Sequence, residues 1–105
     1  IKDLGLFEAA AYQQIGCFDA AVKFARCEGI VPAPESSHAI RAVFDQAEQC
    51  KRDGTAKTIL FNLSGHGHFD MAAYTDYFAG NLEDRDYDEA ALQTALAALP
   101  QVAAE

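Results

Sequence analysis

Apolar residues recur at helical spacing in four segments of the chain, and each recurrence predicts an amphipathic helix. The clearest stripe repeats at i, i+3, i+4 and i+7 and consists of Ile40, Val43, Phe44 and Ala47. Pro34 suits the first position of this helix, because its missing N–H group would have no helical partner there. Asp53-Gly54 ends it. The opposite face carries charges, so we expect one side of the helix to pack and the other to face water.

Three weaker stripes predict the other helices. One follows Cys17 and stops at Gly29, one is capped by Asp70 and closes at Gly80-Asn81, and one is stopped by Pro100. Their apolar residues are Phe18, Ala21, Val22 and Ala25 in the first, Met71, Tyr74 and Phe78 in the second, and Leu92, Leu96 and Leu99 in the third. We expect the leucine stripe to cover the chain's own core.

Two segments predict strands. Residues 6–12 are short and apolar, and Glu8 interrupts them. Residues 57–63 contain the continuous apolar run Ile59-Leu60-Phe61, which is typical of a strand buried on both faces in a parallel sheet. The predicted order is therefore β-α-α-β-α-α, an α/β fold. Two strands are too few to bury both helix layers, and the chain starts at Ile1 in an apolar segment, so we expect a piece of a longer protein.

Composition narrows the function classes. The chain has 105 residues, enough for one small domain, and its 16 acidic against 8 basic residues give a net charge of −8. Nucleic acid is excluded as a partner, because binding it needs a basic face that releases counterions. An anionic membrane surface would repel the acidic chain. No apolar run approaches the roughly 20 residues of a membrane helix. The sequence also shows no signal-peptide pattern.

Cysteine usage indicates a reducing compartment. Cys17, Cys27 and Cys50 are odd in number and irregularly spaced, which argues against a disulfide framework and against a thiolate metal site. We expect all three to be small buried hydrophobes in a cytoplasmic protein.

Two motifs carry the candidate chemistry. The first, residues 28–39, reads Glu-Gly-Ile-Val-Pro-Ala-Pro-Glu-Ser-Ser-His-Ala, and the second, residues 61–70, reads Phe-Asn-Leu-Ser-Gly-His-Gly-His-Phe-Asp. Together they resemble the C-terminal region of the tryptophan synthase beta-chain family. His66-Gly67-His68 and Pro34 resemble the second type of beta chain. The resemblance spans residues 4–82, so we expect residues 1–82 to be the C-terminal part of a catalytic domain. Residues 83–105 would be an acidic linker and an amphipathic tail helix.

The resemblance implies a three-layer αβα fold of the second class of pyridoxal-phosphate enzymes, of which this chain would be a part. It implies condensation of L-serine with indole to L-tryptophan on pyridoxal 5'-phosphate, a homodimeric parent enzyme and a possible alpha subunit. The family's Schiff-base lysine would lie upstream. The lysines of this chain match no cofactor motif, so we expect no catalytic residue here and an inert isolated chain; they are Lys2, Lys23, Lys51 and Lys57.

Three residues match the family's cofactor site. The resemblance implies that the Ser64 hydroxyl meets the pyridine nitrogen, that Glu35 lies beside the ring, and that Gly65, helped by Gly67, lets the backbone come close. The position of Ser64, after a predicted buried strand, is where open α/β sheets bind ligands. The residues alone also allow simpler roles. Ser64 could just turn the chain, and Glu35 could be a first-turn acid worth about 0.3–1 kcal/mol to its helix.

Other functions remain as alternatives. One is another β-replacing or serine-deaminating lyase of the same fold. A second is a hydrolase-like metal site, because His66, His68 and Asp70 alternate along one loop. A third is a non-catalytic interaction module that docks through the leucine stripe of residues 92–99.

Overall fold

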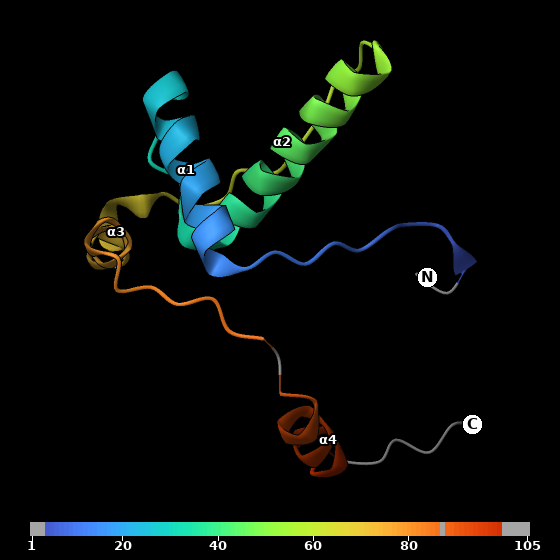
Figure 1. The fold of residues 1–105 in the computed structure, drawn as a ribbon, viewed down its shortest axis with the longest axis vertical. Coiled ribbons are helices and arrows are strands. Elements are labelled where there is room, and N and C mark those ends of the chain that lie inside the picture. Colours follow the sequence, from blue (N-terminus) through green and yellow to red (C-terminus); the bar gives the residue numbers. More distant parts are fainter. Residues whose placement is uncertain (1–3, 87, 100–105) are drawn as a thin grey trace.

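Regular structure is helical throughout the part of the chain that the computed structural model describes, residues 4–86 and 88–99. The elements follow in the order α1 (Gln14–Glu28), α2 (Pro34–Asp53), η2 (Gly67–Phe69), α3 (Met71–Ala79) and α4 (Glu89–Ala97). Figure 1 shows α1 and α2 meeting near their N-terminal ends and diverging like the arms of a V, with α4 apart from the others. All four predicted α-helices are therefore present.

Helix α2 confirms its predicted bounds, because it begins at Pro34 and ends at Asp53. Gly54 closes it in the left-handed conformation, with a φ of 63°, and its N–H donates to the carbonyls of Cys50 and Lys51. Glycine adopts this conformation without the clash that a Cβ atom would cause, which explains why the helix stops there.

Helix α1 starts at Gln14, before the expected Cys17, and its cap comes from far along the chain. Its N-cap residue Gln13 makes no side-chain capping bond. Instead the Asp84 carboxylate accepts a hydrogen bond from the Ile15 N–H at 2.9 Å, across 69 residues of sequence. A carboxylate at this end satisfies a free N–H group and meets the positive end of the helix dipole. The acidic linker therefore stabilises the first turn of α1.

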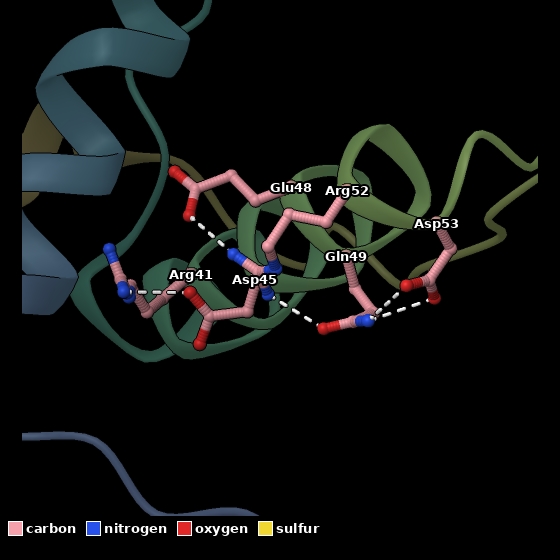
Figure 2. Close-up of polar contacts among 6 residues, drawn as sticks. All are labelled: Arg41, Asp45, Glu48, Gln49, Arg52 and Asp53. Carbon is pink, nitrogen blue, oxygen red and sulfur yellow. Dashed lines mark hydrogen bonds and ion pairs between the residues drawn. The ribbon is translucent and has the colours of Figure 1, made fainter.

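The outer face of α2 is a solvated charged surface. Figure 2 shows Arg41 paired with Asp45 at 2.7 Å, and Gln49 donating to the Asp53 carboxylate at 2.8 Å. Exposed pairs four residues apart contribute about 0.3–0.5 kcal/mol each. The face thus supports the helix locally and carries charged side chains, as the pattern predicted.

The core is small and lies where α1, α2 and α3 meet. Phe18, Ala21 and Tyr74 form its buried centre. Phe18 meets the Tyr74 ring edge to face, with centroids 5.1 Å apart, and stacks on Tyr77 at 5.5 Å. Ile40 is fully buried on the α2 side. Residues from the predicted stripes of α1 and α3 therefore share one apolar centre, and Ile40 is the buried member of the α2 stripe.

Asp70 occupies the predicted N-cap position of α3 but does not cap with its side chain. Its backbone leaves the short helix η2 with φ −110° and ψ 18°, whereas a capping side chain needs an extended backbone. The predicted mechanism is therefore wrong, although α3 does begin at the next residue and closes at Gly80.

The two predicted strands are wrong for the described residues, which contain none. Residues 6–12 and 57–63 have no regular structure, and Leu60 is 97% exposed. A strand needs a neighbouring strand to pair its N–H and C=O groups, and none of the residues that the structure describes supplies one for either segment. Phe61 still packs edge to face on Phe24 of α1, at 6.1 Å. The predicted α/β order is thus correct in its helices and incorrect in its strands.

The chain leaves much of its surface open. Its radius of gyration is 17.3 Å, whereas a compact domain of this length has about 13 Å. Its accessible area is 8378 Å², against about 5,700 Å² for a compact protein of its mass. No residue of α4 is buried, and Leu96 and Leu99 are exposed. The expectation that the leucine stripe covers the chain's own core is therefore wrong, and Pro100 lies outside the described residues.

The cysteines are free and differ in environment. Cys17 is buried, Cys50 is half-buried and Cys27 is exposed. The prediction of a buried small hydrophobe is confirmed for Cys17 and wrong for Cys27. No helix in the described ranges is both long and apolar enough to cross a membrane.

Candidate functional site

The two sequence motifs lie against each other and form one site. The Ser36 hydroxyl, in the first turn of α2, donates a hydrogen bond to the Ser64 carbonyl. The Gly67 N–H donates to the Val31 carbonyl at 2.9 Å. These contacts hold the loop of residues 64–67 along the segment of residues 31–36, so motifs that are separate in sequence share one surface.

Tyr74 closes the site from α3. Its hydroxyl donates to the Pro32 carbonyl at 2.7 Å, and the side chain is 4% exposed. Burial raises the pKa of the Tyr74 phenol, so the neutral donor form is favoured. Sequence reasoning assigned Tyr74 only to an apolar stripe. The available signal was its hydroxyl, because a buried tyrosine usually finds a hydrogen-bond partner.

Both loop glycines are required by the structure, for different reasons. A Cβ atom on Gly67 would lie 2.5 Å from the Pro32 carbonyl oxygen and 2.7 Å from Val31 Cγ1. Gly65 has a φ of 70°, the left-handed region in which side chains are strained. Gly67 therefore permits close packing of the loop, and Gly65 permits the turn that follows Ser64.

The Ser64 side chain is exposed at the edge of this site. Its hydroxyl oxygen lies 3.4 Å from the Ser36 hydroxyl oxygen, which is long for an O–H···O hydrogen bond. Since Ser36 donates to the Ser64 carbonyl, the Ser64 hydroxyl has only this weak contact among the described side chains. A neutral, outward-facing donor is therefore available to a ligand.

Glu35 is close in sequence to this contact but belongs to a different hollow. It is exposed in the first turn of α2, at the positive end of the helix. A hollow of about 210 Å³ between α1 and α2 is lined by Gln14, Cys17, Phe18, Pro34, Glu35 and His38. Ser64 does not line it. The structure thus brings Ser36 against Ser64, and Glu35 lines the hollow between α1 and α2.

The alternative metal site does not form. The His66 ring lies 5.1 Å from the His68 ring and 5.2 Å from the Phe69 ring, centroid to centroid. Within residues 4–86 and 88–99, no three His, Cys, Asp or Glu side chains are grouped so that they could hold a metal ion. His66, His68 and Asp70 are therefore not a three-ligand cluster.

An apolar hollow of about 230 Å³ lies between α1 and α3 and is lined in part by Tyr74. Its lining residues are Val22, Ala25, Arg26, Val31, Met71, Tyr74 and Phe78. The predicted α3 stripe thus faces this hollow as well as the core. Its walls offer packing surface and, apart from Arg26 and the Tyr74 hydroxyl, little polar chemistry.

Comparison with known proteins finds no matching family model and several close relatives. The chain is 67% identical to tryptophan synthase beta chain 2 of Methanosarcina mazei over 79 residues, 75% of this chain and 18% of the relative. It is 60% identical to the Aquifex aeolicus beta chain 2 over 84 residues, 80% of this chain and 19% of the relative. It is 52% identical to the Pyrococcus horikoshii beta chain over 96 residues, 91% of this chain and 20% of the relative.

The chain therefore spans about a fifth of the length of these curated relatives. A matched stretch of 96 residues leaves out at most nine of the 105, so the Pyrococcus horikoshii match reaches into α4. The likeness is thus wider than the expected limit at Leu82.

Proposed function

Because the chain belongs to the tryptophan synthase beta-chain family, we propose that it forms the C-terminal part of a catalytic domain that condenses L-serine with indole to L-tryptophan. The observation that carries this proposal is the contact between the two motifs. This contact leaves the Ser64 hydroxyl exposed, and the hydroxyl makes only a weak hydrogen bond, to Ser36 at 3.4 Å.

The donor set fits pyridoxal 5'-phosphate. A serine hydroxyl is a neutral donor, and it suits a pyridine nitrogen that carries no proton. When bound, the cofactor supplies the electron sink for replacing the hydroxyl group of serine by indole. Ser64 would donate to the ring nitrogen and keep it unprotonated, whereas a carboxylate there would favour the protonated ring.

The neighbouring residues would support this contact. Gly65 supplies the left-handed turn that leaves the Ser64 side chain at the open edge. Glu35 would lie beside the ring; it is exposed and makes no ion pair among the described residues, and it lines the neighbouring hollow between α1 and α2. The Schiff-base lysine would come from the longer protein, and this chain would contribute binding and orientation.

The longer protein would also complete the fold. We propose that residues 1–82 belong to the three-layer αβα catalytic domain and that residues 57–63 become a strand within its sheet. The exposed Leu60 side chain and the excess accessible area of about 2,700 Å² support this, since both leave surface that a longer protein would cover. Residues 83–105 would form an acidic linker and a tail helix. The parent enzyme would be a cytoplasmic homodimer with a possible alpha subunit.

The test is made in the full-length beta chain that carries this sequence. Ser64→Ala should remove a hydrogen bond worth about 0.5–1.5 kcal/mol, and Ser64→Asp should favour the protonated ring. The two variants should therefore change the absorbance bands of the bound cofactor in different ways when serine is added. Thr75→Ala is the matched control, because the Thr75 hydroxyl donates within α3 to the Met71 carbonyl. Identical band proportions in all four proteins would reduce Ser64 to a turn residue.

A further inference from the structure

Ser36 is a buried polar residue whose hydroxyl bonds to a group outside its own helix. It is 5% exposed, and it donates to the Ser64 carbonyl, 28 residues away in sequence. Its neighbour Ser37 is buried as well, but donates to the Ala33 carbonyl at 3.0 Å, within its own turn. A serine in a helix commonly bonds back to its own turn, as Ser37 does. Ser36 therefore makes a contact that the local helix does not require.

The loop that carries Ser64 is already attached without Ser36. The Gly67 N–H bonds to the Val31 carbonyl, and Tyr74 holds the adjoining Pro32 carbonyl. Neither bond involves Ser64 itself, and the left-handed turn at Gly65, with a φ of 70°, lies between Ser64 and Gly67. The orientation of the Ser64 peptide is thus controlled by Ser36 more directly than by either of them.

We propose that Ser36 is a positioning residue, which sets the direction in which Ser64 offers its hydroxyl to the cofactor ring. The inference rests on the proposed function. By donating its hydrogen to the Ser64 carbonyl, Ser36 fixes that peptide plane. Its oxygen then faces the Ser64 oxygen at 3.4 Å as a weak acceptor only. Ser64 keeps its hydrogen for the ligand, in an orientation that the helix determines.

The test compares Ser36→Ala with Ser37→Ala in the full-length beta chain. Both remove one hydroxyl from one buried serine of the same turn, but only the first touches Ser64. In cofactor-free protein, we expect Ser36→Ala to speed hydrogen exchange at the Gly67 amide about two- to tenfold. Ser37→Ala should leave it near the wild-type rate. If Ser36→Ala does not give folded protein, Ser36→Cys keeps the side-chain volume with a weaker donor and should show a smaller effect in the same direction.

The second readout is the absorbance of the bound cofactor after serine is added. Ser36→Ala should shift the band proportions in the same direction as Ser64→Ala, and less far. The double variant should match Ser64→Ala alone, because Ser36 acts through the hydroxyl that Ser64→Ala removes. Full additivity of the two shifts would overturn the positioning role.

The outcomes separate the two proposals. A changed spectrum in Ser64→Ala beside an unchanged one in Ser36→Ala overturns the role of Ser36 and leaves the proposed function standing. An unchanged spectrum in Ser64→Ala overturns both. A changed spectrum in Ser37→Ala of the same size as in Ser36→Ala makes the effect a general loss of helix packing, and the inference fails.

Discussion

Among the glycines that the structure describes, Gly67 should tolerate substitution by alanine least for steric reasons. Gly67 is buried, and the added Cβ atom would lie 2.5 Å from the Pro32 carbonyl oxygen, 2.7 Å from Val31 Cγ1 and 3.0 Å from the Tyr74 ring. The nearest of these atoms is backbone, so it cannot rotate away as a flexible side chain could. Either the loop or the Pro32 segment must move.

The expected cost follows from the contacts that this movement breaks. Overpacking of a filled site costs about 1–3 kcal/mol. Displacing the loop also weakens the bond from the Gly67 N–H to the Val31 carbonyl, a further loss of about 0.5–1.5 kcal/mol. Together these terms predict a loss of about 1.5–4.5 kcal/mol in the free energy of unfolding.

Gly80→Ala is the matched control. Gly80 has a φ of 73° at the end of α3, but nothing lies within 4 Å of the added Cβ atom. Its cost is backbone strain of about 1–2 kcal/mol, partly offset by about 0.4–1 kcal/mol from the reduced entropy of the unfolded chain. The assay is urea unfolding of the chain followed by far-ultraviolet circular dichroism, with the slope of the transition compared between variants. A Gly67→Ala loss no larger than that of Gly80→Ala would refute the steric argument.

Two further predictions concern ionisation and the isolated chain. The hydrogen bond from the Tyr77 hydroxyl to Asp19, with partial burial, raises the pKa of Tyr77 above its ordinary value of 10.0. A raised folded-state pKa gives stability that is complete below the unfolded value and is lost as the pH rises through the folded value. Tyr77→Phe should therefore reduce, without abolishing, the fall in Tm between neutral and strongly alkaline pH, and an unchanged fall would contradict this. The isolated chain, treated with pyridoxal phosphate and borohydride, should give no stoichiometric adduct on a single lysine, because no lysine lies in a cofactor motif; peptide mapping by mass spectrometry decides it.

The helices were predictable because their hydrogen bonds are internal. The residues that begin and end α2, Pro34 and Gly54, act within a few positions of the helix they bound. The strands could not be predicted in the same way, because a strand depends on a neighbouring strand, and the described residues provide none for residues 57–63. The same limit applies to α4, whose leucine spacing predicts a helix but cannot say what, if anything, covers it.

The candidate site was predictable in part. Sequence motifs identified Ser64 and Gly65, and the structure places both in the loop that meets the first motif. Ser36 was missed, because a serine in a first helical turn looks ordinary until its partner across the fold is known. Glu35, expected beside the cofactor ring, lines the hollow toward α1, and the next residue along the helix, Ser36, meets Ser64.

The cap that Asp84 provides for α1 has a consequence for biosynthesis. The ribosome makes Ile15 first and must add 69 more residues before Asp84 exists. At about 5–20 residues per second, this takes roughly 3–14 s. During that interval the first turn of α1 has no carboxylate at its end, so the nascent helix should fray there. The acidic segment would then stabilise the N-terminal turn of α1 only after α2 and α3 have been synthesised.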